Sequence, residues 1–197
     1  MTEGKVLPLR RVHGTVDEMS DRALVSAVAQ GDQAALGALY DRFHRDVYRF
    51  IAHLLCGDMQ VDDLVQSTFI EAHRSAPRFR GESTVKTWLF GISANLTRHH
   101  QRSEARRKSA GDKLATVPLA NPITPGEAIT LEQQRRWLAA AVEMLSPALK
   151  EVYVLCVIEE VPGKEAAQVL GIREASLWRR LTDARTALRA AIEEMQS

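Results

Sequence analysis

The chain has 197 residues, of which 45% are hydrophobic and 26% charged, and its formal net charge is +1 at pH 7. These values are ordinary for a globular protein of one or two domains, and they exclude a global excess of cations as a nucleic-acid signal. The chain shows neither a secretory signal nor an apolar run long enough to span a membrane, so we expect a cytoplasmic protein without membrane insertion. Cys56 and Cys156 lie in apolar runs without paired spacing, which favours buried, reduced thiols. Helical periodicity predominates over β-strand alternation, which predicts an all-α fold.

The chain opens with a tail and two predicted helices. Residues 1–19 are typical of a mobile terminal segment. Ser20 is suited to cap a short helix over residues 21–30, and Asp32 is suited to cap a longer one over residues 33–56. The longer helix carries apolar residues at three- and four-residue steps along its whole length, so we expect it to lie in the core.

A third helix is predicted over residues 59–76, started by Asp58 and closed by Pro77. Residues 58–71 contain four acids and no Lys or Arg. The predicted outward-facing members of this helix are Asp62, Asp63 and Gln66. This helix therefore offers a negative surface, which would favour a different kind of partner from the positive segment that follows it.

Residues 79–108 combine a basic, polar loop with a fourth predicted helix, for which Ser83 is a plausible N-cap. Trp88, Leu89, Ile92 and Leu96 recur at helical spacing and predict one buried face. Beyond it, residues 98–108 hold five cations against one acid. Such a helix suits a polyanion lying across its outer face, but a solvated surface helix is an equally good interpretation of this segment alone.

Residues 109–126 contain three of the seven prolines and no helical period, which predicts a linker between two domains. The second domain then begins at residue 127, with a helix expected over residues 128–145. Ser146 and Pro147 form a strong helix start, and the Pro162-Gly163 pair ends the helix that follows.

A helix-turn-helix pattern follows over residues 163–181. Ala167 is small where two helices cross, Gly171 allows the tight turn, and Ile172 and Leu177 are the apolar residues that hold the second helix. An ordinary helical hairpin is the alternative. Residues 173–189 contain five arginines against two acids, as expected for a helix that enters the major groove while arginines hold phosphates. Trp178 on this helix could pack on a thymine methyl or a sugar, or lie in the core.

These motifs resemble a known family. DDLVQSTFIEAHR and FRGESTVKTWLFGISANLTRHHQR resemble region two of the extracytoplasmic-function sigma factors, and LSPALKEVYVLCVIEEVPGKEAAQVLGIREASLWRRLTDARTALR resembles their region four. The likeness covers nearly everything from Ser20 to the C-terminus. It implies a region-two domain over residues 20–108 and a region-four helix-turn-helix domain over residues 127–197, joined by a flexible linker over residues 109–126.

The resemblance implies a sigma factor, which binds core RNA polymerase, reads the minus-ten and minus-thirty-five promoter elements, helps to open DNA and is controlled by an anti-sigma factor. Region two would bind the clamp of the polymerase largest subunit through Asp62, Asp63 and Gln66, and region four would meet the polymerase flap through its apolar flank. The implied minus-ten contacts are Arg78, Arg80, Ser83, Thr84, Lys86, Thr87, Trp88, Asn95, Arg98, His99 and Arg102. The implied minus-thirty-five contacts are Arg173, Ser176, Trp178, Arg179, Arg180 and Arg185.

Physical reasoning supports this division, because a short polar loop on rigid helices can trap an unstacked base by hydrogen bonds and aromatic stacking. Two of the residues stay open: Trp88 could stack on a base or lie in the core, and Asn95 could touch DNA or bond a helix end. The recognition helix also departs from the family pattern of proline, glycine-threonine, an apolar residue and lysine. Residues 173–178 read REASLW, so the minus-thirty-five sequence cannot be transferred.

Two other classes of protein are alternatives to a sigma factor. One is a helix-turn-helix repressor or activator that does not enter the polymerase and has no need of Asp62 and Asp63. The other is an enzyme. Adjacent pairs such as Asp62-Asp63 and His99-His100 splay apart on a helix, so they do not form a metal site, and no phosphate-binding loop or nucleophile motif is present. We therefore expect no catalysis, no cofactor, no metal and no small-molecule substrate.

Overall fold

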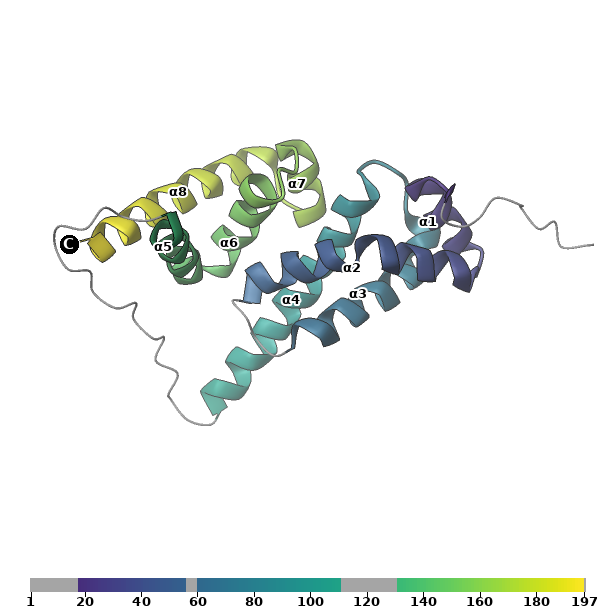
Figure 1. Ribbon diagram of the computed structural model, residues 1–197, viewed down its shortest axis with the longest axis horizontal. Helices are drawn as coiled ribbons and strands as arrows, with labels where there is room; N and C mark the ends of the chain where they lie inside the picture. The colour runs from purple at the N-terminus through teal and green to yellow at the C-terminus, as the bar shows by residue number, and fades with distance from the viewer. Residues whose placement is uncertain (1–17, 56–59, 111–130, 197) are drawn as a thin grey trace, which may run out of the picture.

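The computed structural model describes residues 18–55, 60–110 and 131–196, and within these ranges it is helical without a strand. Figure 1 shows two groups of helices, in agreement with the predicted all-α fold of two domains. The first group comprises α1 (Asp21–Ala29), α2 (Gln33–Leu55), α3 (Val61–Ser75), the 3-10 turn η2 (Ala76–Arg78) and α4 (Val85–Ala110). The second group comprises α5 (Leu131–Met144), α6 (Pro147–Tyr153), the π-helical turn η3 (Val154–Ile158), α7 (Gly163–Leu170) and α8 (Glu174–Gln196).

Side-chain caps fix the starts of the first helices. The Ser20 hydroxyl accepts a hydrogen bond from the Ala23 amide at 3.3 Å, and the Asp32 carboxylate accepts from two amides of the first turn of α2 at 2.9 and 3.1 Å. Both predicted caps are therefore confirmed. The predicted start of the third helix at Asp58 lies outside the described residues, and α3 is described from Val61.

The predicted cap of the fourth helix is wrong by one residue. Thr84, not Ser83, accepts the amide hydrogen bond of Thr87 at 3.0 Å, while the Ser83 hydroxyl donates to the Thr84 carbonyl oxygen. Thr84 is the cap because α4 begins at Val85, and the amide that a capping hydroxyl can reach lies three residues beyond it.

The core of the first group is formed by the apolar stripes of α1 to α4. Leu39, Phe43, Val47 and Ile51 of α2 meet Val65 and Phe69 of α3 and Leu89 of α4 in one buried cluster. The predicted stripe of α2 is thus confirmed. Of the residues predicted to form the buried face of α4, Leu89 lies inside this cluster, whereas Trp88 and Ile92 are half-buried at its edge. Fewer residues of α4 are therefore fully buried in this core than the spacing predicted.

In the second group, Pro147 occupies the first turn of α6 as predicted, although the Ser146 side chain makes no capping hydrogen bond. The helix expected over residues 147–160 instead changes to the π-helical turn η3 and ends at Glu160, whose φ is +52°. Cys156 in this turn is half-buried, and burial raises the pKa of its thiol, which lowers the fraction of reactive thiolate. Cys56 lies outside the described residues.

The helix-turn-helix is formed as predicted. Gly171 adopts a left-handed conformation, with φ +66° and ψ +33°, and the Ile172 amide donates back to the Ala167 carbonyl oxygen at 3.0 Å. Leu177 is 0% exposed, and Ile172 packs against the same apolar cluster. These contacts set the start of α8 against α7.

The two groups of helices share one apolar cluster, which the sequence did not predict. Phe50 and Leu54 of α2 and Phe90 and Ala94 of α4 are buried together with residues of the second group. The rings of Phe50 and Phe90 are stacked, with centroids 4.4 Å apart. The members from the second group are Val152, Val154, Leu155, Val161, Ala166, Ala167, Leu170, Leu177 and Leu181. The helix-turn-helix unit therefore packs directly on α2 and α4.

Candidate nucleic-acid interface

The acidic outer surface of α3 is accessible. Asp62 and Asp63 lie in the first turn of the helix, where carboxylates interact favourably with the positive end of the helix dipole, and both are exposed. Gln66, one turn further, is also exposed. The structure therefore places the three residues predicted to bind polymerase together on one free surface.

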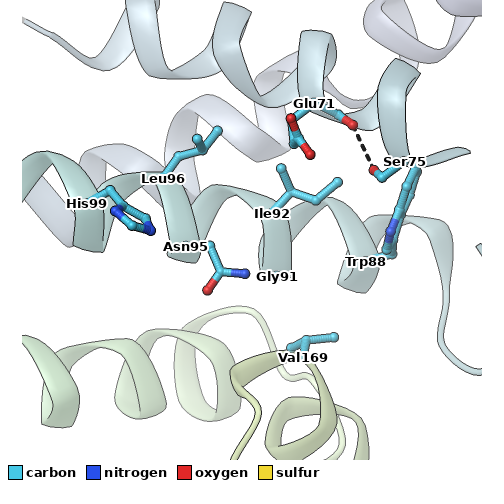
Figure 2. Close-up of a pocket in the computed structure, with 9 residues that line it drawn as sticks. All are labelled: Glu71, Ser75, Trp88, Gly91, Ile92, Asn95, Leu96, His99 and Val169. Carbon is cyan, nitrogen blue, oxygen red and sulfur yellow. Dashed lines mark hydrogen bonds between the residues drawn. The ribbon is translucent and has the colours of Figure 1, made fainter. Parts of the chain in front are cut away.

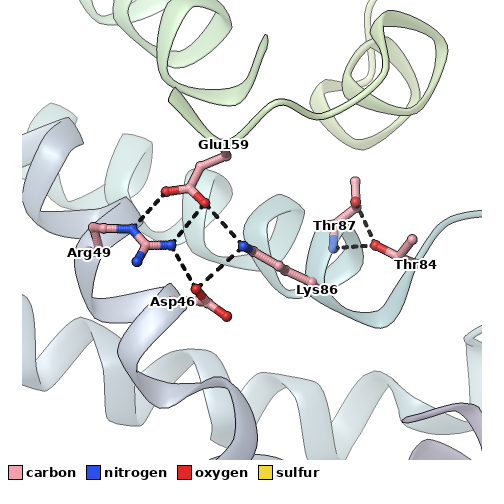
Figure 3. A network of polar contacts seen from close by, with 6 residues as sticks. All are labelled: Asp46, Arg49, Thr84, Lys86, Thr87 and Glu159. Atoms are coloured by element: carbon pink, nitrogen blue, oxygen red, sulfur yellow. Dashed lines mark hydrogen bonds and ion pairs between the residues drawn. The ribbon is translucent and has the colours of Figure 1, made fainter. Parts of the chain in front are cut away.

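The loop before α4 divides the predicted minus-ten residues. Arg78, Arg80 and Thr84 are exposed and Ser83 is half-buried. Thr87 is only 3% exposed, and its hydroxyl and that of Thr84 lie 2.7 Å apart (Figure 3). Thr87 thus serves the start of α4 and presents no surface to DNA in this conformation.

Trp88 borders a groove rather than lying in the core. Its ring packs on Phe79 with centroids 4.8 Å apart, and it lines a pocket together with Ile92, Asn95 and His99, which Val169 of α7 faces from the other side (Figure 2). Asn95 is exposed and its side-chain oxygen accepts a hydrogen bond from Arg98 at 2.7 Å. This bond joins two side chains in the middle of α4 and not a helix end, so the predicted bond to a helix end is not seen, and DNA contact by Asn95 stays a prediction.

The C-terminal half of α4 carries the predicted cations. His99 and Arg102 are exposed, as are Arg106 and Arg107 beyond them. Arg98 is different, because its guanidinium lies 3.0 Å from the Glu151 carboxylate of α6. The end of the helix thus presents exposed cations, of which Arg107 lies 3.2 Å from Glu104 of the same helix, while the cation nearest its centre has a partner in the second group of helices.

The outer surface of α8 holds the predicted minus-thirty-five residues. Arg173, Arg179 and Arg185 are exposed, and Ser176 and Arg180 are half-buried. Arg173 lies directly before α8, and Arg179 and Arg185 are six residues apart and so point to different sides of the helix, with Arg185 bordering a groove beside Tyr153 and Leu188. The second helix of the helix-turn-helix therefore presents several exposed cations that suit a polyanion, but they do not form one strip.

Trp178 lies outside the core, at the junction of α7 and α8. The residue is 48% exposed, its indole nitrogen donates to Glu174 at 3.2 Å, and its six-membered ring lies against Gly163. A Cβ atom on Gly163 would lie only 2.4 Å from Trp178 Cζ2. Because Gly163 has no side chain, the ring can pack against its backbone, and the contacts with Gly163 and Glu174 fix the ring although the residue is exposed.

A charged network between the two groups of helices was missed by the sequence interpretation. Glu159, at the end of η3, lies 3.2 Å from Arg49 of α2 and 3.3 Å from Lys86 of α4, and Asp46 contacts the same two cations at 2.7 and 3.3 Å (Figure 3). The Glu159 side chain is 2% exposed. In the sequence, these residues are indistinguishable from ordinary surface charges. The one available signal is that α4 has apolar residues on two sides, which indicates that two different sets of helices pack against it.

Glu151 is the second buried carboxylate of this junction. Its side chain is 7% exposed, and burial raises its pKa to about 7, although Arg98, Arg180 and Arg102 each act to lower it. Loss of hydration therefore outweighs three neighbouring cations at this site.

Other kinds of site find no support in the part of the chain that the structure describes. No group of three or more His, Cys, Asp or Glu residues there could hold a metal ion. Nor does any helix in the described ranges have the length and apolar character needed to cross a membrane.

A helix-turn-helix with a cationic second helix, joined to a helical domain with separate acidic and basic surfaces, defines a DNA-binding transcription protein. Comparison with known families makes the class specific. The family model for Sigma-70 region 2 matches residues 39–107, and the model for Sigma-70, region 4 matches residues 135–188. The chain belongs to the extracytoplasmic-function sigma factors, which are non-catalytic subunits of transcription initiation.

Similar proteins agree with this assignment. The chain is 26% identical over 187 residues to the ECF RNA polymerase sigma-E factor of Haemophilus influenzae, covering 91% of this chain and 98% of that protein. The Escherichia coli K12 sigma-E factor is 26% identical over 181 residues, which cover 87% of this chain and 94% of that protein.

Among solved structures, CnrH in complex with the cytosolic domain of CnrY has a TM-score of 0.63 and 27% identity, covering 88% of this chain and 97% of that one. The sigma factor RpoE of Bartonella quintana, in complex with the anti-sigma factor NepR, shares the fold, with a TM-score of 0.62, 23% identity, and coverage of 78% of this chain and 94% of that one. A regulator that does not enter the polymerase is not favoured, because the match includes region 2 as well as the helix-turn-helix.

Proposed function

We propose that this chain binds core RNA polymerase through the outer surface of α3 and directs it to promoters through the basic surfaces of α4 and α8. The observation that carries the proposal is the separation of charge. Asp62, Asp63 and Gln66 form an exposed acidic surface on one helix, and the exposed arginines lie on two others. Opposite charges on different helices suit two partners of opposite charge, a basic protein surface and a polyanion.

The duplex contact is assigned to α8. Arg179 and Arg185 would neutralise phosphates, while Ser176 and Trp178, nearer the start of the helix, would meet base edges or sugars. Because Trp178 is held over Gly163 by packing and by Glu174, it offers an apolar ring in a fixed position. A ring held in this way could contact a thymine methyl group.

The minus-ten contact is assigned to the loop before α4 and to the exposed side of α4. Arg78, Arg80, Arg102 and His99 are accessible to single-stranded DNA, and the groove beside Trp88 offers an aromatic edge against which a base could stack. Lys86 and Arg98 belong to the same surface but are engaged by carboxylates of the second group.

Control by an anti-sigma factor is proposed from the relatives. CnrH and RpoE were each solved with a protein partner, CnrY and NepR. In this chain, a groove between α5, α6, η3 and α8 is lined by the apolar residues Leu138, Tyr153, Val157, Leu188 and Ile192 and is bordered by the charged residues Arg185, Arg189 and Glu193. Leu138 and Val157 are exposed. This apolar groove is the surface that we assign to the polymerase flap and, in competition with it, to an anti-sigma factor.

The proposal is tested by charge reversal on α3. The Asp62→Lys, Asp63→Lys variant should lose binding to core RNA polymerase and promoter-directed transcription, yet bind duplex DNA at least as well as the wild type. A control with the same change of net charge is Asp41→Lys, Glu194→Lys, which reverses two exposed carboxylates elsewhere. If both variants bind core polymerase like the wild type, α3 is not the polymerase surface.

The duplex assignment is tested by Arg179→Ala and Arg185→Ala. Each should weaken binding to promoter duplex in a titration followed by fluorescence anisotropy, and each should reduce the slope of log affinity against log salt by about one. Arg106→Ala on α4 is a matched control, because it removes an exposed arginine that we do not assign to the duplex. An unchanged salt slope in both α8 variants would contradict the assignment.

A further inference from the structure

The second group of helices covers part of the surface of α4 that we assign to minus-ten DNA. Beyond the shared apolar cluster, α7 approaches α4 so closely that a Cβ atom on Gly91 would lie 3.0 Å from the Val169 Cβ (Figure 2). A side chain at position 91 would require Val169 to move by a few tenths of an ångström, so glycine suits this close approach. The packing is therefore specific and not a loose juxtaposition of two domains.

The polar contacts across this junction pair carboxylates with the predicted DNA-binding groups. Glu159 contacts Lys86, and Glu151 contacts Arg98, at 3.3 and 3.0 Å. Glu165 of α7 accepts a hydrogen bond from the backbone amide of Thr84 at 3.4 Å. Two cations and one backbone donor of the minus-ten surface thus face carboxylate oxygens where DNA would present phosphate oxygens.

The neighbouring loop is tied down as well. The Gln168 side-chain amide of α7 donates to the Glu82 carboxylate at 2.5 Å. Glu159 also holds Arg49, and Asp46 supports both cations, so the network would lose its buried carboxylate if the second group moved away (Figure 3). Hydrogen bonds to charged groups are among the stronger ones, so these contacts favour the packed arrangement appreciably.

We propose that the free chain is self-inhibited: Glu151, Glu159 and Glu165 of the second group of helices imitate the DNA backbone and mask the minus-ten surface until this group is released from α2 and α4. This inference rests on the proposed function, since it assigns DNA contact to Lys86 and Arg98. Release would free those cations and uncover the apolar cluster in one event. Polymerase could favour release by holding the two units apart.

A disulfide lock tests the proposal. Gly91→Cys and Val169→Cys are introduced together in the full chain after Cys56 and Cys156 are changed to alanine, because the two Cβ positions, 3.0 Å apart, need to separate by only about 0.5–1 Å to reach the usual spacing of a disulfide. In dilute solution with oxidised glutathione, the pair should form an intramolecular disulfide. The oxidised protein should bind a short fluorescein-labelled single-stranded DNA and core polymerase at least about tenfold more weakly than the same protein after reduction.

Each outcome is decisive. If no disulfide forms and Glu159→Gln also binds the DNA no more tightly than Glu160→Gln, the packed arrangement is not populated in the free chain. If oxidised and reduced protein bind the DNA equally, packing does not mask the surface. If the reduced protein binds neither the DNA nor core polymerase, both the proposed function and the proposed self-inhibition are wrong. In that case, the yield of disulfide still reports separately on whether the two groups of helices pack together.

A second variant avoids new cysteines. Glu159→Gln in the full chain should bind the same single-stranded DNA about 5- to 50-fold more tightly, because a buried charged partner of Lys86 is lost from the packed state. Glu160→Gln is the matched control, since it removes an exposed carboxylate one residue away. Equal affinities for the two variants would overturn the proposal.

Discussion

Glu151 provides the most quantitative prediction of the structure. Its carboxyl group is buried on α6 beside Arg98, and burial raises its pKa from 4.5 to about 7. Replacement by glutamine keeps a side-chain oxygen that can accept the Arg98 hydrogen bond but removes the ionisation. The Glu151→Gln variant therefore isolates the pH dependence that this one carboxyl group gives to folding.

The sign of the effect follows from the two pKa values. Because the folded pKa lies above the unfolded value, the folded state binds the proton more tightly. The corresponding stability is fully present below about pH 4.5 and is lost as the pH rises through about 7. The total is roughly 3 kcal/mol, at about 1.4 kcal/mol for each pH unit of difference between the two pKa values. His53 acts in the opposite sense, because burial lowers its pKa and its protonation below pH 6.5 disfavours the fold.

The assay is urea unfolding of both proteins between about pH 5 and pH 8.5, followed by circular dichroism and tryptophan fluorescence. The free energy of unfolding of Glu151→Gln, relative to the wild type, should rise by roughly 3 kcal/mol across this range. The contribution of His53 cancels in the difference. Glu160→Gln, which alters an exposed carboxylate, should show a flat difference. A flat difference for Glu151→Gln as well would refute the conclusion that burial controls this group.

Two further predictions concern the helix-turn-helix. Gly163→Ala should destabilise it by about 1–3 kcal/mol in thermal unfolding, because the new methyl group would overlap the Trp178 ring. Adding Trp178→Ala to this variant should restore part of the lost stability, and losses that simply add would contradict the contact. Leu177→Ala should cost about 2–5 kcal/mol in urea unfolding, because its side chain is fully buried, and a cost under about 1 kcal/mol would contradict its role in holding α8.

Local structure was largely predictable from the sequence. Apolar spacing identified the helices, Ser20 and Asp32 identified two of their starts, and Gly171 identified the turn of the helix-turn-helix. These features depend on contacts within a few residues, so the signals lie close together in the chain. The error at Ser83 has the same origin, because two adjacent hydroxyl residues compete for one cap and their difference is small.

The junction between the two groups of helices was not predictable in this way. Helical periodicity places Phe50 on the apolar side of its helix, but it does not identify which other helix buries that residue. Glu151 and Glu159 look like ordinary surface acids until tertiary packing buries them against Arg98 and Lys86. For the same reason, the sequence presented Lys86, Arg98 and Thr87 as free for DNA, whereas the structure engages two of them and buries the third.

The shared apolar cluster also has a consequence for synthesis of the chain. Phe50, Leu54, Phe90 and Ala94 leave the ribosome well before Leu177 and Leu181, which help to bury them. At about 5–20 residues per second, the 83 residues from Ala94 to Leu177 take about 4–17 s to translate. During that interval the apolar side chains of Phe50, Leu54, Phe90 and Ala94 are exposed on the nascent first domain. Exposed apolar surface of this kind binds chaperones and promotes aggregation at high expression.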